Sequence, residues 1–285
     1  MNFIKAFFRK NFTEASIAKK VISLTIFAVF FVIAGVSIVQ AISSMTVTDT
    51  FNDSTKIASA TNVTVDTVNG QIYLSQAAAW SCGSSLFDTR DGKSYATVLI
   101  GSQCWMQQNL NVGTMVSYGG NQGVSTTSIQ KYCYGNGETN CTTYGGFYQW
   151  DQAMGGSVTA GTRGICPSGW HFPTHYEWTQ LELATCTSGS CATSFPYDYT
   201  TTGARGTNEG TTLKASAGLF KGIYFMGGRY NDGSWQWIGQ YGRYWASNQS
   251  GANAWYRQLE SNGVSTVYRS TDSKIQGLSI RCVKD

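Results

Sequence analysis

Eight cysteines limit what this chain can fold into more than any other feature of its sequence. Eight thiols allow roughly a hundred disulfide pairings, and the sequence alone does not choose among them. Spacing nevertheless favours two bridges, Cys133 with Cys141 and Cys186 with Cys191, because each would close a short polar loop that contains glycine. Zinc is the competing interpretation, but the chain has only two histidines and no C-x-x-C pair. We therefore expect a disulfide-stapled fold with no metal.

An uncharged apolar run over residues 21–39 indicates that the rest of the chain is exported. At about 1.5 Å per residue, a helix of this length just spans a hydrocarbon core of about 30 Å. Lysines and arginines precede the run, which favours a cytoplasmic basic segment over residues 1–20. Val39-Gln40-Ala41 also fits a cleavage site, so residues 21–41 are either a signal peptide or a transmembrane anchor. We expect the remainder at the extracellular face of the membrane or secreted, where disulfides form.

The net charge excludes one class of partner. The formal charge of +4 comes from the N-terminal segment, because without its five basic residues and one acidic residue the chain keeps 15 basic and 15 acidic residues. A neutral domain lacks the phosphate-neutralising surface that nucleic-acid binding requires. We therefore expect no nucleic-acid partner, and a membrane partner only through residues 21–39.

Composition changes at residue 80. Residues 42–79 are rich in Thr, Ser, Asn and Val and read as a stalk. Within this stalk, residues 62–75 alternate apolar and polar side chains and contain Asn69-Gly70, which is a hairpin signal. Tryptophan and cysteine begin at Trp80 and Cys82, so we place the main domain over residues 80–285.

Helix and strand signals within residues 80–285 predict an α+β fold with two short helices and a twisted antiparallel sheet. Residues 95–105 read as strand, turn and strand, and residues 146–154 favour a short helix. The clearest helix covers residues 174–184, because Thr174 and Glu177 form a T-x-x-E capping box. Short strands and turns follow from residue 221 onward.

The two histidines offer the only general base for a nucleophilic triad, and neither is expected to be catalytic. His171 lies in a rigid aromatic turn and reads as a hydrogen-bonded structural residue, and His175 is expected to be solvated in the first helical turn. Glu177 and Glu182 would face different sides of one helix, which disfavours glycoside hydrolysis by paired carboxylates. We predict a protein that is not an enzyme and has no catalytic residues or cofactor.

Calcium would need several convergent oxygens. Asn231-Asp232-Gly233 and Asp272-Ser273 are possible fragments of such a site, but both read more simply as turns. The prediction therefore remains that no metal is bound.

Residues 228–274 are the most informative stretch for function. They interleave Tyr and Trp with Ser, Asn, Gly, Asp and Arg, as antibody paratopes do. Three side chains are expected to face inward: Trp245, Trp255 and Leu259. Three tyrosines are expected to be exposed: Tyr241, Tyr256 and Tyr268.

Five segments carry a resemblance to a known family: residues 88–95 (DTRDGKSY), 100–111 (IGSQCWMQQNLN), 144–150 (YGGFYQW), 164–174 (GICPSGWHFPT) and 277–285 (GLSIRCVKD). Together, over roughly residues 82–285, they resemble the Fibrobacter succinogenes major paralogous domain. That family is similar to the C-type-lectin-like fold, which implies a compact α+β domain whose last strands carry a ligand face. The resemblance also implies two further disulfides, Cys166 with Cys282 and Cys82 with Cys104.

The stretch 244–255 and the Arg281-Cys282 ending also resemble variable proteins of diversity-generating retroelements, in which adenines of Asn codons are randomised. Ten residues fit what such codons can become, and they form the ligand-binding set that this resemblance implies: Tyr230, Asn231, Tyr241, Arg243, Tyr256, Arg257, Tyr268, Ser270, Thr271 and Asp272. The Glu-Pro-Asn and Gln-Pro-Asp motifs of calcium-dependent lectins do not occur in the sequence, and neither does the late cysteine pair of formylglycine-generating enzymes.

We therefore expect a receptor-like or adhesin-like protein that binds a protein or glycan on another cell or virus. A structural cell-envelope protein with no specific ligand is the main alternative. An enzyme similar to formylglycine-generating enzymes, or one that acts on glycans, is the weaker one.

Overall fold

The computed structural model describes residues 62–66, 71–75, 80–117, 120–195, 198–215, 220 and 225–285. Residue contacts divide the chain into two units, Met1–Ala79 and Trp80–Asp285. The basic segment 1–20 and the apolar segment 21–41 lie outside the described residues. Within the described ranges, every helix is too short or too polar to cross a bilayer.

The first unit contains one described element, the hairpin of β1 (Asn62–Asp66) and β2 (Gln71–Ser75). The two strands pair antiparallel, with Asn62 opposite Ser75 and Asp66 opposite Gln71. This pairing confirms the hairpin predicted over residues 62–75.

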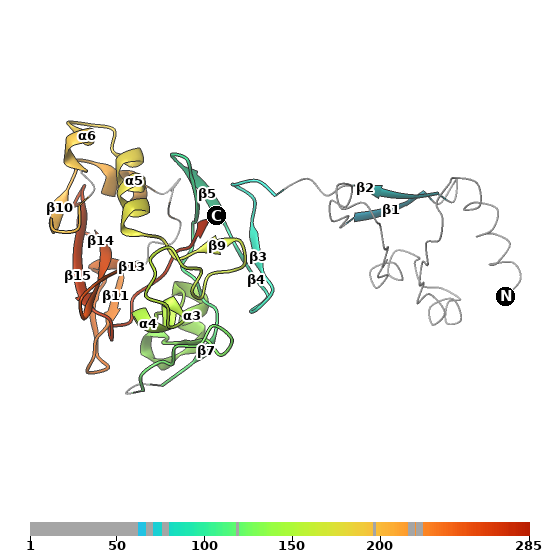
Figure 1. Ribbon diagram of the computed structural model, residues 1–285, viewed down its shortest axis with the longest axis horizontal. Coiled ribbons are helices and arrows are strands. Elements are labelled where there is room, and N and C mark those ends of the chain that lie inside the picture. The colour runs from blue at the N-terminus through green and yellow to red at the C-terminus, as the bar shows by residue number, and fades with distance from the viewer. Residues whose placement is uncertain are drawn as a thin grey trace, which may run out of the picture. The chain divides into compact units, whose positions relative to one another are not determined.

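A six-stranded sheet dominates the second unit (Figure 1). Its strands run in the order β10-β15-β14-β13-β11-β12. They are β10 (Gly203–Arg205), β11 (Met226–Arg229), β12 (Trp235–Ile238), β13 (Tyr241–Ser250), β14 (Asn253–Glu260) and β15 (Val267–Ser273). Every pairing is antiparallel except that of β11 with β13. The last third of the chain thus builds most of this sheet.

A four-stranded sheet holds the beginning and the end of the second unit together. It has the order β5-β6-β16-β9, formed by β5 (Thr97–Ile100), β6 (Gln103–Met106), β16 (Val283–Lys284) and β9 (Trp170–His171). The β5–β6 hairpin confirms the strand, turn and strand predicted over residues 95–105. Two small pairs complete the strands: β3 (Leu86–Asp88) with β4 (Lys93–Tyr95), and β7 (Thr114–Met115) with β8 (Gln130–Lys131).

Helix α5 (His175–Thr185) confirms the clearest helix prediction. Both bonds of its capping box are present, since the Glu177 backbone N–H donates to the Thr174 hydroxyl and the Thr174 N–H donates to the Glu177 carboxylate. The indole N–H of Trp178 on this helix donates a hydrogen bond to the carbonyl oxygen of Trp245 at 3.3 Å, so the helix packs on β13 (Figure 1). The helix therefore covers one face of the six-stranded sheet.

The prediction of two short helices was incomplete. The helix expected over residues 146–154 is shorter, α4 (Trp150–Met154), because Phe147 and Tyr148 form β-bridges with Tyr132 and Leu278 instead. The remaining helices are short and were not predicted: η1 (Tyr134–Asn136), α3 (Glu138–Tyr144), α6 (Cys191–Ser194) and α7 (Glu209–Lys214). Strands, sheets and these few helices make the unit a mixed α+β fold.

All eight cysteines form disulfides, and the four pairs are those expected: Cys82–Cys104, Cys133–Cys141, Cys166–Cys282 and Cys186–Cys191. Cys166–Cys282 joins residues 116 positions apart. In the chain-entropy model, a bridge over so long a loop is the most stabilising.

Buried aromatic side chains pack against part of each face of the six-stranded sheet. One core cluster contains Trp150 and Trp245, and the other contains Trp178 and Trp255. Trp245, Trp255 and Leu259 are at most 2% exposed, which confirms their predicted inward orientation.

Candidate ligand-binding face

Strand register decides which of the ten predicted ligand residues lie together. Arg243 pairs with Gln258, which pairs with Tyr268, and in the next row Tyr256 pairs with Ser270. Because side chains alternate between the two faces of a strand, residues two apart share a face. Six predicted residues therefore lie on one face of β13, β14 and β15: Tyr241, Arg243, Tyr256, Tyr268, Ser270 and Asp272. We call these six, together with Tyr230, the tyrosine face.

Tyr230 joins the tyrosine face from the end of β11. Its hydroxyl accepts a hydrogen bond from Arg243 Nη1 at 3.3 Å. Asn231 follows it at the exposed tip of the β11–β12 hairpin. The tip is closed by Asp232, whose Oδ1 accepts bonds from the Ser234 N–H and hydroxyl at 2.8 and 2.7 Å. This segment is a turn, as predicted, and no cluster of metal-ligating side chains is found within the described ranges.

Arg243 organises the centre of the tyrosine face although it is only 4% exposed. Its Nη2 donates to Asp272 Oδ2 at 2.6 Å, and its Nη1 donates to Gln276 Oε1 at 3.2 Å. Its guanidinium also stacks over the Tyr256 ring, 4.2 Å from the ring centroid. A planar guanidinium makes all these contacts at once, which fixes the relative positions of its neighbours.

Tyr256 corrects the expectation of exposed tyrosines. Its side chain is 7% exposed, because Arg243 covers one side of the ring and the Trp245 indole meets it edge-on. Burial raises the pKa of Tyr256. Tyr241 and Tyr268 are half-buried rather than exposed as expected, and Tyr268 packs against the core cluster that contains Trp150 and Trp245. The accessible part of the face is therefore limited to the outward sides of these two rings.

Two of the ten predicted residues point to the opposite face. Arg257 pairs with Tyr244 and Arg269, and Thr271 pairs with Trp255, all on the side that α5 covers. Arg257 is fully buried, and its guanidinium bonds Glu182 of α5. The assignment of Arg257 to a surface that contacts ligand is therefore wrong, and the cause is the two-residue period of the strand.

His175 was expected to be solvated and is instead fully buried. Arg257 Nη1 lies 3.1 Å from its Nδ1, and Arg269 Nη1 lies 3.4 Å from its Nε2. Burial and the charges of both arginines lower the pKa of His175 to about 3, so the ring stays neutral. This cluster fastens α5 to β14 and β15 beneath the tyrosine face.

His171 is held between two carboxylates, which confirms the structural role predicted for it. Its Nε2 lies 2.6 Å from Glu177 Oε1, and its Nδ1 lies 2.7 Å from Asp285 Oδ1. The hydrogen bond with Glu177 and the one with Asp285 raise the pKa of His171 despite partial burial. With both ring nitrogens engaged and every cysteine in a disulfide, this histidine has no thiol to activate.

Trp237 belongs with this surface, although the predicted ligand set did not include it. The side chain is 43% exposed, and its indole N–H donates to the Tyr230 hydroxyl at 2.7 Å. Its ring centroid lies 5.4 Å from that of Tyr241. Trp237 lies in the aromatic stretch of the sequence. It was left out of the predicted ligand set because that set contained only residues that an Asn codon can encode after adenine changes.

Comparison with known families gives a match, which lies within the second unit, Trp80–Asp285. The family model described as the Fibrobacter succinogenes major domain matches residues 98–284, about two thirds of the chain. The chain belongs to this family. No curated protein matches it, and no solved structure does. The match covers every residue of the tyrosine face.

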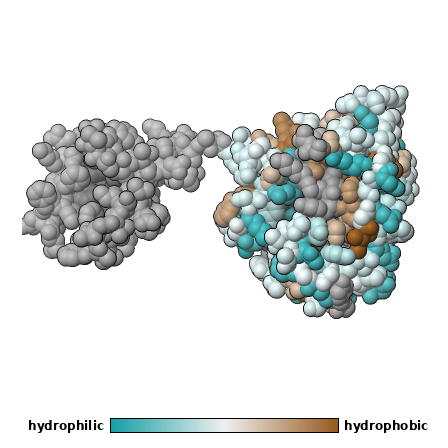
Figure 2. Space-filling model, turned by 180° about the vertical axis from the view of Figure 1, so that it is seen from behind, coloured by the Kyte–Doolittle hydropathy of each residue, from teal (hydrophilic) through white to brown (hydrophobic). Residues whose placement is uncertain are grey.

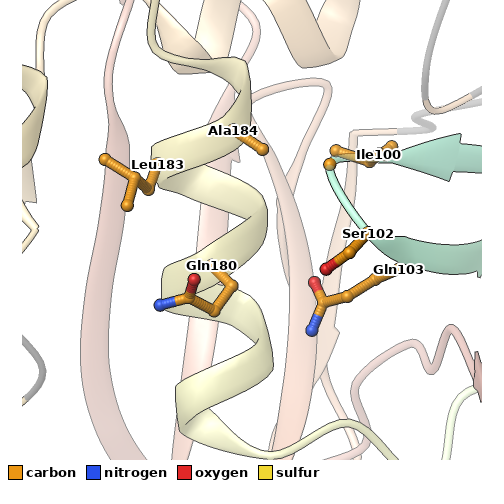
Figure 3. A pocket seen from close by; sticks show the side chains of 7 residues that line it. Ile100, Ser102, Gln103, Gln180, Leu183 and Ala184 are labelled. Atoms are coloured by element: carbon orange, nitrogen blue, oxygen red, sulfur yellow. The ribbon is translucent and has the colours of Figure 1, made fainter.

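This Fibrobacter succinogenes major domain also has a shallow hollow of about 230 Å³ between the β5–β6 turn and α5 (Figure 3). Ile100, Ser102 and Gln103 lie on one side of it, and Gln180, Leu183 and Ala184 of α5 lie on the other. None of the ten predicted residues lines this hollow, and no charged side chain does.

The surface of the domain carries no dominant apolar area on the side drawn in Figure 2, where apolar residues gather in small patches among polar ones. Apart from Trp237, large exposed apolar side chains are scattered over several elements, among them Phe87 on β3 and Leu99 on β5. Scattered single residues of this kind are ordinary for a protein surface. The tyrosine face is therefore distinguished by its arrangement rather than by its hydrophobicity.

Proposed function

We propose that this protein is a surface-displayed or secreted binding protein whose tyrosine face contacts a protein or glycan on another cell or virus. One observation carries the proposal. Seven of the ten candidate residues form the tyrosine face of a single sheet, and three of them, Tyr230, Tyr256 and Asp272, contact the guanidinium of Arg243. Random placement along alternating strands would divide them between two faces.

The chemistry of the face suits recognition. Tyrosine offers a large contact area and a hydroxyl at little cost in side-chain entropy, while Ser270 and Asp272 add directional hydrogen bonds. The Arg243 contacts hold Tyr230, Tyr256 and Asp272 in place before any ligand arrives. Such preorganisation reduces the entropy lost on binding.

Beneath the face, the support is rigid. Helix α5 is fixed to β14 and β15 by buried contacts of Arg257 and Arg269, and the Cys166–Cys282 bridge closes the domain. A scaffold of this kind tolerates exposed substitutions, which usually change stability by less than about 0.5 kcal/mol. We propose on this basis a C-type-lectin-like domain whose exposed face is diversified by a retroelement.

Diversification has its own test. Sequencing the gene's neighbourhood should reveal a reverse transcriptase and an imperfect repeat of the coding region for residues 228–285. Variable codons should map to half-buried or exposed positions such as Tyr268 and Ser270, and not to Arg257. Absence of both genetic elements would leave a binding protein with a fixed face.

Export and membrane attachment through residues 21–41 are part of the same proposal, because a ligand on another cell is reached only from outside. We propose a binding role rather than an enzymatic one, since both ring nitrogens of His171 are hydrogen-bonded within the protein and all eight cysteines are in disulfides. A structural envelope protein would need no such ordered polar face.

Tyr268→Ala tests the binding role. The full-length chain, purified in mild detergent, is screened against arrays of cell-surface proteins and glycans. We expect Tyr268→Ala to weaken binding to the ligand found by about tenfold, because removal of a well-packed interface aromatic typically costs more than about 1 kcal/mol.

Phe87→Ala is the matched control, because Phe87 is a 59% exposed aromatic on β3, outside the face. It should bind like the unaltered chain. Equal binding by Tyr268→Ala and the unaltered chain would contradict the assignment of this face. The lack of any ligand on either array would favour the structural alternative.

A further inference from the structure

The backbone at Trp237 adopts a conformation that tryptophan rarely takes. Its φ is +66°, in the left-handed region where a side chain costs roughly 1–2 kcal/mol. Gly227 on the neighbouring strand has a φ of +61°, and a Cβ there would collide with the backbone oxygen of Gln236. A strained, exposed tryptophan opposite a required glycine is a built feature of the hairpin, and strain of this kind concentrates at functional sites.

The strained conformation presents an aromatic pair to solvent. The Trp237 and Tyr241 rings are 5.4 Å apart and inclined by 40°. The hydrogen bond from the indole N–H to the Tyr230 hydroxyl fixes the orientation of the Trp237 ring. Trp237 is 43% exposed and Tyr241 is half-buried, so a ligand would reach the pair mainly over the Trp237 ring.

Polar side chains surround the pair. One carboxylate lies beside it, because Glu260 pairs with Tyr241 across β13 and β14, and its negative charge disfavours an acidic sugar. The Gln240 N–H donates to the carbonyl of Trp237, and the Ser261 N–H donates to the carbonyl of Gln240, so both residues border it. Gln240, Ser261 and the hairpin-tip residue Asn231 are exposed. The nearest carboxylate in the hairpin tip, Asp232, is turned into its own turn by Ser234.

Addition of a partner strand does not fit this edge. Strand β12 lies at the end of the six-stranded sheet, but the left-handed residue Trp237 interrupts the extended backbone that a continuing ladder needs. An apolar peptide anchor would need a pocket, and the hollow described above lies elsewhere, between the β5–β6 turn and α5. The surface instead offers open rings with a rim of amides and hydroxyls.

We propose that Trp237 and Tyr241 stack against a sugar ring, so that the ligand of this surface is a neutral glycan. A pyranose has an apolar face of axial C–H groups that packs on aromatic rings, and its rim of hydroxyls pairs with amides such as those of Asn231 and Gln240. This inference rests on the proposed binding function and names the ligand class for the edge of the tyrosine face.

The test uses the full-length chain in detergent with three neutral probes: cellohexaose, a β-1,3-linked glucose hexamer and chitohexaose. Binding is measured by titration calorimetry and by the change in tryptophan fluorescence. We expect at least one probe to bind, and Trp237→Ala and Tyr241→Ala each to weaken it by about tenfold. Phe87→Ala should bind unchanged.

A stability readout separates a ligand role from a packing role. Trp237→Gly removes the ring and relieves the backbone strain together. We expect its melting temperature to be at or above that of Trp237→Ala, with probe binding lost in both. A fall in the melting temperature of Trp237→Gly below that of Trp237→Ala would overturn the strain argument.

The remaining outcomes are decisive as well. Probe binding that survives Trp237→Ala overturns the stacking site. If no probe binds while a protein ligand found on the arrays is lost in Tyr268→Ala, the glycan inference fails and the proposed binding function stands. If neither probes nor array ligands bind, both fail.

Discussion

The buried side chain of Arg243 fixes the positions of several residues of the tyrosine face. Its guanidinium reaches Asp272, Gln276, the Tyr230 hydroxyl and the Tyr256 ring. A lysine in its place would be a single point of charge and could not make these contacts together. Position 243 therefore tolerates fewer residues than we expected when Arg243 was included among the ten codon-selected residues.

Arg243→Ala is expected to lower the free energy of unfolding by about 2 kcal/mol, because Asp272 and Gln276 lose their buried partner. Arg243→Lys should lie between Arg243→Ala and the unaltered chain. Urea denaturation followed by fluorescence measures the difference, and the exposed Arg163→Ala serves as the control. An Arg243→Ala change within about 0.5 kcal/mol would show that the network does not stabilise the fold.

At the level of elements, α5 and β14 are joined by a charge pair that has no access to water. Arg257 and Glu182 have side chains that are 0% and 1% exposed. Removing one partner of such a pair leaves an uncompensated charge, whereas replacing both by apolar groups is often neutral. The pair therefore specifies how the helix sits on the sheet more than it stabilises the packing.

Arg257→Met is expected to cost about 3–5 kcal/mol of unfolding free energy, because Glu182 stays buried. The double variant Arg257→Met/Glu182→Leu should recover much of that loss. Equilibrium denaturation of the two single variants and the double variant gives the coupling energy. Additive effects would show that the two side chains do not depend on each other.

His171 links three elements: β9, the N-terminus of α5 through Glu177, and the residue that follows β16, Asp285. Its pKa is raised in the folded state, chiefly by the hydrogen bond with Glu177. Its contribution to stability is thus fully present below the unfolded pKa of about 6.5 and is lost as the pH rises through the higher folded value.

We expect the melting temperature to fall as the pH rises from neutral through the alkaline range, and His171→Asn to remove that part of the dependence. Calorimetry at a series of pH values compares the two proteins. Parallel curves for both would show that His171 does not contribute to the pH dependence.

At the scale of the whole molecule, the bridges differ in the length of chain they close. Cys166–Cys282 spans 116 positions and Cys186–Cys191 spans 5. In the chain-entropy model, the longer loop contributes more, up to about 4–5 kcal/mol.

Replacing Cys166 and Cys282 together by serine is therefore expected to reduce the unfolding free energy more than the matched change at Cys186 and Cys191. Guanidinium denaturation of both double variants without reductant provides the comparison. A larger loss from the short bridge would contradict the loop-length argument.

The sequence foretold local features better than tertiary ones. The capping box at Thr174 was predictable because its two residues are three positions apart in the chain. The disulfides Cys82–Cys104 and Cys166–Cys282 were predictable only because the family resemblance implied them. Strand alternation alone would have separated Arg257 from Tyr256, since adjacent residues cannot share a face. Burial of Tyr256 and His175 depended on Arg243, Arg257 and Arg269 reaching them from other elements, which no local pattern reveals.

The strained backbone at Trp237 could not be predicted from the sequence either. Nothing in the sequence around Trp237 marks a left-handed residue, because glycine or asparagine is the usual sign of one. Gly227 is a glycine at which a positive φ could have been suspected. The reason that glycine is required there is the close backbone of Gln236 on β12, which the sequence does not show.

Strand β16 lies between β6 and β9, so late residues occupy the middle of the smaller sheet. During folding, β6 and β9 cannot be joined until Val283 is available between them, and Cys166 cannot form its native disulfide until Cys282 is available. A chain truncated before Cys282 would leave two unpaired strand edges and the free thiol of Cys166. Closure of the domain therefore depends on residues 282–284.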